Sequence, residues 1–254
     1  EKYIKKGHLI ADITLKFNEE GKLKENYIIK GLVRDGEIKK IQNFNLSKLN
    51  FLFNLKKDLF NFEDIQLSLN NKSILFPKLD VKKKQNGFLI SGKNINDDIS
   101  LKKNEIIKFL NNDLFFPEII STEFDLENSF SFLVDKKYRV KDLKIDSNLN
   151  IKKLNFLGKF NLKEYFPGIN DEIILTDQKV KIKYEKKLIS AKGKGNIILQ
   201  KEIDDIEYEF IKSREYLKFD TFIKIQKNPF NLDILNFKKD LNFNLEIILS
   251  GSKD

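Results

Sequence analysis

Apolar and polar residues alternate along most of the chain. Near the start, the apolar positions are Leu9, Ala11, Ile13, Leu15 and Phe17, and most of the residues between them are polar. The same two-residue period returns over residues 143–151 and 241–249. Because successive side chains of a strand point to opposite faces, this pattern predicts a sheet with one apolar face and one polar face. The fold class is therefore predicted to be all-β, with a few short helices.

Turn residues divide this pattern into about a dozen strands. Asp35-Gly36 is a typical hairpin dipeptide and predicts a turn between strands over 27–34 and 38–41. Helical spacing of apolar residues predicts a short helix over 103–112. A helical turn is predicted over 161–166 and a second short helix over 231–237.

The chain is expected to form one elongated segment, or two stacked units over about 1–95 and 118–254 joined by the helical interruption at 103–112. Residues 62–67 (FEDIQL) and 140–145 (VKDLKI) form a weak internal echo, each with an Asp followed by alternating apolar residues. Stacked units of similar plan would produce such an echo. Because the chain starts at Glu1 and contains no Met, we expect it to be a processed product or a piece of a longer protein.

The composition leaves few groups that could perform chemistry. The chain has no Cys and a single histidine, His8, so a disulfide framework, a thiolate metal site and a cysteine nucleophile are excluded. No nucleophile elbow, zinc-protease motif or phosphate-binding loop is present. The paired acids Asp97-Asp98 and Asp204-Asp205 lack the spacing of a calcium loop. We therefore predict no enzymatic activity, no cofactor and no metal.

The formal net charge is +9, with 47 basic and 38 acidic residues. Lys is spread along the polar positions of the strands, which is typical of a solvated face, and Arg is scarce. Aromatic residues do not alternate with Arg as in a base-stacking platform. We therefore expect no nucleic-acid partner and little functional role for the positive charge.

Four segments carry a resemblance to a known family: residues 27–36 (YIIKGLVRDG), 62–69 (FEDIQLSL), 163–167 (KEYFP) and 193–199 (GKGNIIL). With them the chain resembles an internal or C-terminal part of the AsmA-like bacterial periplasmic proteins of the YhdP and TamB type. The resemblance spans most of the chain, although each segment alone has low specificity. It implies a long, twisted antiparallel sheet curled into a groove, in a parent protein tethered to the inner membrane.

The resemblance also implies a function in outer membrane biogenesis. The chain would be a non-catalytic segment of a periplasmic lipid-transport bridge, with phospholipid acyl chains sliding along its apolar face. The partners would be phospholipid and, through other parts of the parent protein, the inner and outer membranes. Representative groove positions on the apolar phase of strands are Ile13, Leu15, Phe17, Ile65, Leu67, Leu69, Leu143, Ile145, Ile223, Leu245 and Ile247.

Alternation alone does not separate this groove from a closed core. A β-sandwich or β-solenoid serving as a structural or adhesive module needs one apolar face as well. A carbohydrate-active enzyme is disfavoured because the chain has no Trp and no recognisable acid pair.

Overall fold

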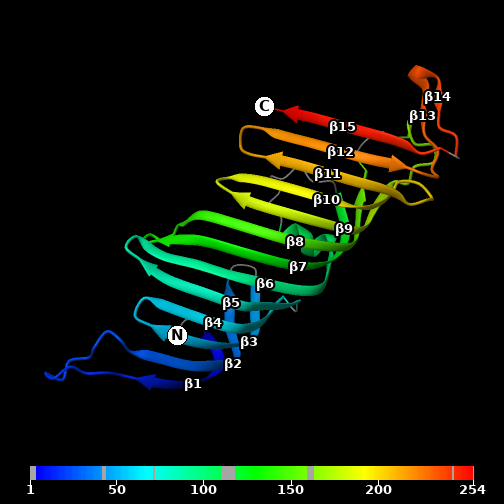
Figure 1. Ribbon diagram of the computed structural model, residues 1–254. Coiled ribbons are helices and arrows are strands. Elements are labelled where there is room, and N and C mark those ends of the chain that lie inside the picture. Colours follow the sequence, from blue (N-terminus) through cyan, green and yellow to red (C-terminus); the bar gives the residue numbers. More distant parts are fainter. Residues whose placement is uncertain are drawn as a thin grey trace. The chain divides into compact units, whose positions relative to one another are not determined.

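The fold is described from a computed structural model, which describes residues 4–41, 44–70, 72–109, 118–158, 163–241 and 243–253. Strands account for 73% of the described residues and helices for 4%, which confirms the all-β prediction. Thirteen strands form one antiparallel sheet in the order β1-β2-β3-β4-β5-β6-β7-β8-β9-β10-β11-β12-β15 (Figure 1). The order follows the chain, so neighbouring strands in sequence are neighbours in the sheet.

The first half of the sheet contains long strands joined mostly by tight turns. Their bounds are β1 Ile4–Thr14, β2 Ile28–Ile41, β3 Phe44–Lys56, β4 Leu59–Leu69, β5 Lys72–Lys84, β6 Gly87–Lys102, β7 Glu118–Asp135 and β8 Val140–Leu157. The second half has β9 Glu172–Glu185, β10 Leu188–Ile198, β11 Asp204–Lys212, β12 Leu217–Ile225 and β15 Leu245–Lys253. A separate two-stranded ribbon is made by β13 Asn231–Leu232 and β14 Phe237–Lys238.

The helical predictions are only partly correct. The helix α1 spans Lys103–Phe109, and residues 110–112 of the predicted helix lie outside the described residues. The described part of 161–166 forms turns. The predicted helix at 231–237 is wrong, because this segment contains the β13–β14 ribbon around a short 3-10 helix, Asp233–Leu235.

The described chain divides into two compact units. Unit 1 comprises Glu1–Asn96 and Glu127–Asp146, and unit 2 comprises Asp97–Leu126 and Ser147–Asp254. The division therefore falls inside β6, β7 and β8, whereas the predicted stacked units were separated at the connection around 103–117.

Five aspartates inside strands adopt positive φ angles of 50–54°: Asp35, Asp64, Asp98, Asp142 and Asp177. Asp is one of the few non-glycine residues that tolerate this conformation. At Asp35, Asp64 and Asp177 the strand places two residues opposite one on its neighbour, which is a β-bulge. The hairpin predicted at Asp35-Gly36 is therefore wrong, because both residues lie within β2. The echo between 62–67 and 140–145 marks the same strand conformation at Asp64 and Asp142.

Candidate functional site

One face of unit 1 carries apolar residues in three rows that cross the sheet from β1 to β6. In the first two rows the residues lie directly opposite one another on neighbouring strands. In the third row, Phe51 lies opposite the bulge at Asp64 on β4, and the last residue lies opposite a second bulge on β5. We call them the apolar rows. They are Ile13–Ile29–Leu55–Phe60–Val81–Ile90, Ala11–Gly31–Phe53–Phe62–Leu79–Gly92, and Leu9–Val33–Phe51–Ile65–Phe76, the last of which ends at Asn94 on β6.

The opposite face of the same strands is more polar. A complete row of polar residues crosses it between the first two apolar rows: Asp12–Lys30–Asn54–Asn61–Asp80–Ser91. Asn61 donates a hydrogen bond to Asp80 at 2.6 Å, and Lys78 forms an ion pair with Asp80 at 3.3 Å. The next row on this face, Ile10–Leu32–Leu52–Glu63–Lys78–Lys93, is apolar on β1–β3 and charged on β4–β6, so the contrast between the two faces is sharpest on β4–β6.

Glycines in the middle row allow aromatic rings to lie across the backbone. A Cβ at Gly31 would lie 2.6 Å from Cζ of Phe53, and a Cβ at Gly92 would lie 2.9 Å from Cζ of Phe130. The Phe51 ring packs edge-on against Phe62, with 5.8 Å between centroids. A side chain at either glycine would displace a ring, so these positions need glycine for close approach. The rings cover the sheet and present carbon atoms to whatever lies above it.

Most side chains in the apolar rows of unit 1 are only partly buried. Ile65 is 8% exposed, while Leu9 and Ile13 at the β1 edge are 67% and 60% exposed. The phenylalanines of the rows, Phe51, Phe53, Phe60, Phe62 and Phe76, are all half-buried. A closed hydrophobic core would hold several of these large side chains fully out of water, so this face is only partly covered by the described residues.

Unit 2 also has an apolar face, but one end of it is covered. A cluster of buried residues includes Ile173, Leu175, Ile197, Ile206, Ile223 and Ile225, and Ile225 is fully buried. Phe166 belongs to this cluster, and Tyr165, Ile169 and Phe230 pack against it. These four residues lie in the segments that follow β8 and β12, and we call them the cover. This end of unit 2 is a closed core.

Buried polar groups hold the cover in place. Asn228 donates from Nδ2 to the Asp204 carboxylate at 2.6 Å and to the Glu202 carbonyl at 2.8 Å. Asp204 and Asn228 are 0% and 1% exposed. The side-chain Nε2 of Gln200 donates to the Pro167 carbonyl at 2.6 Å, and the backbone amide of Asn231 donates to the Tyr165 carbonyl at 2.9 Å. Buried polar groups that are paired in this way fix one arrangement of the chain.

Away from the cover, the apolar face of unit 2 repeats the glycine–aromatic pairing. Gly193 lies directly opposite Tyr208, and Gly251 lies opposite Phe219. A Cβ at Gly251 would lie 2.6 Å from the Phe219 ring. Burial raises the pKa of the Tyr208 hydroxyl to about 12, so this group stays neutral and the face remains uncharged there.

The predicted groove residues differ in where they lie and in how far they are buried. Ile13 and Ile65 belong to the apolar rows of unit 1, and Leu67 and Leu69 continue the same face along β4. Leu15 and Phe17 lie beyond β1, are exposed, and Phe17 bridges to Leu23. Leu143 and Ile145 are half-buried on β8.

The remaining predicted positions lie in the closed part of unit 2. Ile223 pairs with Ile247, and Leu245 pairs with the fully buried Ile225. The prediction left out the phenylalanines that dominate unit 1, although the pairs Phe51, Phe53 and Phe60, Phe62 keep the two-residue period in the sequence.

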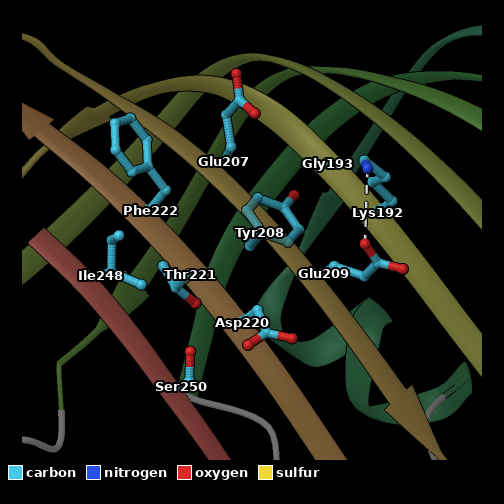
Figure 2. Close-up of a pocket in the computed structure, with 10 residues that line it drawn as sticks. All are labelled: Lys192, Gly193, Glu207, Tyr208, Glu209, Asp220, Thr221, Phe222, Ile248 and Ser250. Carbon is cyan, nitrogen blue, oxygen red and sulfur yellow. Dashed lines mark ion pairs between the residues drawn. The ribbon is translucent and has the colours of Figure 1, made fainter.

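A shallow hollow of about 220 Å³ lies in unit 2, lined by β10, β11, β12 and β15 (Figure 2). It includes a polar row in which Lys192 forms an ion pair with Glu209 at 3.6 Å. The Ser250 hydroxyl, which donates to the Asp220 carboxylate, and the nearby Lys218 hold the pKa of Asp220 below its usual range. No His or Cys lines the hollow.

In the described part of the chain, no three or more His, Cys, Asp or Glu side chains come close enough to hold a metal ion. His8 lies exposed on β1, opposite Arg34. Of the helices that the structure describes, none has the length and apolar character needed to span a bilayer.

Comparison of the chain with protein-family models, curated proteins and solved structures found no match.

Proposed function

We propose that this chain is a non-catalytic segment of a periplasmic lipid-transport bridge of the AsmA-like type. Phospholipid acyl chains would lie on the apolar rows and move between the inner and outer membranes. The parent protein would be tethered to the inner membrane. The observation that carries this proposal is the set of apolar rows across β1–β6 of unit 1, whose side chains remain partly exposed.

The chemistry of the apolar rows suits an acyl chain. An acyl chain makes no hydrogen bonds, and it gains about 0.8 kcal/mol for each CH₂ that leaves water. With strands about 4.8 Å apart, a row across six strands extends for roughly 24 Å. Two of the rows are apolar or glycine along this whole length, and the third is apolar as far as β5 and ends at Asn94 on β6. An acyl chain on the first two rows therefore meets no polar side chain that would hold it in place.

The closed end of unit 2 supports the second candidate, a structural or adhesive module. There the cluster around Ile225 has the burial of an ordinary core. In that case the apolar rows of unit 1 would also be covered by protein, no acyl chain could bind, and the whole chain would serve a structural role.

A crosslinking experiment distinguishes the two candidates. A photoreactive phenylalanine analogue is placed at Phe62, on the middle apolar row, and in a matched variant at Asn61, the adjacent residue on the polar row. The protein is expressed in a bacterial cell envelope, irradiated, and analysed by mass spectrometry. We expect phospholipid adducts at Phe62 and none at Asn61.

Crosslinks from Phe62 only to the protein's own chain, in a folded variant, would reject the lipid proposal and favour the closed module. Equal lipid adducts at Phe62 and Asn61 would indicate adventitious contact with the membrane, and would also reject it.

A further inference from the structure

Three tight turns of unit 1 lie at the same ends of their strands: those between β3 and β4, β5 and β6, and β7 and β8 (Figure 1). The amide of Lys83 donates to the Asp58 carbonyl at 2.9 Å, which joins the first two turns. Gly87 packs so closely on β7 that a Cβ there would overlap the Val134 carbonyl oxygen. The three turns therefore form one continuous edge, which we call the turn rim.

The turn rim is strongly basic. Residues 56–58, 82–88 and 135–141 contain nine Lys or Arg side chains and two carboxylates, Asp58 and Asp135. The sequence prediction of evenly spread charge is thus wrong for unit 1, because the fold gathers separate short runs of Lys at one edge. Charges this close together produce a local potential that single lysines do not.

Only some of these cations are neutralised by a partner. Asp135 accepts hydrogen bonds from the Lys137 and Arg139 amides at 2.8 and 3.0 Å and pairs with the Arg139 guanidinium at 2.8 Å. The side-chain Nζ of Lys83 lies 3.9 Å from the Asp58 carboxylate, and Lys57 forms an ion pair with Glu25. Lys82, Lys84, Lys136 and Lys137 form no ion pair with any described residue, and all four are exposed. The Asp135 contacts thus order a turn whose neighbouring lysines remain available.

The turn rim borders the apolar rows directly. The apolar row nearest the rim crosses β5 at Val81, and Lys83, two residues further on the same face, lies opposite Phe88 of β6. Lys82 and Lys84 lie on either side of Lys83 and on the other face of β5, at the same edge of the sheet. An apolar face beside a row of cations is complementary to an amphiphile that has an apolar tail and an anionic head.

We propose that the turn rim binds the phosphate of anionic phospholipid headgroups while their acyl chains lie on the apolar rows. This inference rests on the proposed function and adds a lipid class to it. The favoured cargo is a lipid with net negative charge, such as phosphatidylglycerol, over the zwitterionic phosphatidylcholine. Ammonium groups act on phosphate as compact point charges on flexible stems, so the rim would accept headgroups without a fixed geometry and allow them to move.

The test measures how much labelled lipid the purified chain extracts from vesicles. One set of vesicles carries fluorescent phosphatidylglycerol and the other carries fluorescent phosphatidylcholine with the same acyl chains. The rim variant replaces Lys82, Lys84, Lys136 and Lys137 by Gln. The matched control replaces Lys30, Lys93, Lys179 and Lys194, exposed lysines of the polar strand faces, and so removes the same charge. Circular dichroism and melting temperature check that both variants fold.

We expect the rim variant to lose about tenfold of its phosphatidylglycerol extraction and to keep its phosphatidylcholine extraction, with the control unchanged within about twofold. Equal loss in the control would show a general charge effect and overturn the inference. Full competition by inorganic phosphate at the concentration of lipid would assign the rim to free phosphate and overturn it too. Tight binding of a single-stranded oligonucleotide that is lost in the rim variant, without lipid preference, would assign it to nucleic acid.

The outcomes separate this inference from the proposed function. If the parent chain extracts both lipids equally and the rim variant behaves like the parent, the headgroup inference fails and the acyl-chain proposal stands. If the parent chain extracts neither lipid, the proposed function fails and the inference fails with it. If the rim variant does not fold, lipid extraction by the parent chain is measured at increasing salt concentration instead. The inference requires the preference for phosphatidylglycerol to fall steeply with salt, and a preference that does not change with salt would overturn it.

Discussion

The two units share the same alternation of apolar and polar residues, but they differ in how far the apolar face is covered. In unit 2, Phe166 and Phe230 fold back on the sheet, and Ile225 beneath them is fully buried. In unit 1, the apolar rows include Ile65 as a buried side chain, while their phenylalanines remain half-buried. The difference shows that a strand pattern with one apolar face does not decide what covers that face. Long connections decide it, because the cover comes from the segments after β8 and β12.

The largest expected effect is a charge placed under the cover. Ile225→Asp buries a carboxylate without a partner and should lower the free energy of unfolding by about 4 kcal/mol or more. Leu67→Asp in unit 1 should cost about 1 to 2 kcal/mol, since a half-buried carboxylate reaches water. Urea unfolding of both variants measures the difference. Equal losses would mean that the face of unit 1 is as closed as that of unit 2.

A smaller effect should follow from removing one polar support of the cover. Asn228→Ala removes the hydrogen bonds to Asp204 and to the Glu202 carbonyl and leaves Asp204 underpaired. We expect a loss of about 2 to 3 kcal/mol and faster proteolysis after Lys163 and Lys238, which flank the cover. Asn148→Ala, at an exposed position of β8, serves as the control and should change stability by less than about 0.5 kcal/mol. A stable Asn228→Ala variant would show that apolar packing alone holds the cover.

The bulges of the sheet should show a distinct substitution pattern. Asp64 has a φ of 50°, so Asp64→Ala should cost about 1 kcal/mol, whereas Asp64→Gly should be neutral because glycine adopts this conformation freely. The neighbouring Glu63 is exposed and carries no such constraint, and Glu63→Ala is the control. Thermal unfolding of the three variants tests this order. If Ala and Gly at position 64 are equally stable, the bulge is not set by the backbone conformation of Asp64.

The smallest effect concerns acid stability at the turn rim. The Arg139 amide and guanidinium hold the pKa of Asp135 well below its ordinary value of 3.8. A lowered carboxyl pKa stabilises the fold above the ordinary value, and this stability is lost as the pH falls through the folded-state pKa. Asp135→Asn should therefore unfold at a lower denaturant concentration than the parent at neutral pH, and this difference should shrink as the pH falls below 3.8 and vanish only as the pH reaches the folded-state pKa of Asp135. A constant difference at every pH would show that the Asp135 charge does not contribute.

The alternation in the sequence determined the fold class and most strands, because in-register pairing requires side chains to alternate between the faces. The aspartates that begin the motif at Asp64 and Asp142 were visible as an echo in the sequence. The sequence did not show whether such an Asp forms a turn or a bulge, because Asp tolerates the same backbone conformation in both. At Asp35 the choice is made by β3, where the Asn50 side-chain carbonyl accepts the Asp35 amide at 3.0 Å.

The sequence by itself thus determined that the chain is a sheet whose strands alternate apolar and polar residues. Only the tertiary structure decided which parts of the apolar face are covered and where the positive charge gathers. The cover depends on contacts between segments far apart in the sequence, such as Tyr165 with Asn231. The turn rim likewise joins Lys82, Lys84, Lys136 and Lys137, which no local pattern connects. Local periodicity determines which face of the sheet a side chain lies on, whereas the arrangement of strands and connections determines which other side chains lie next to it.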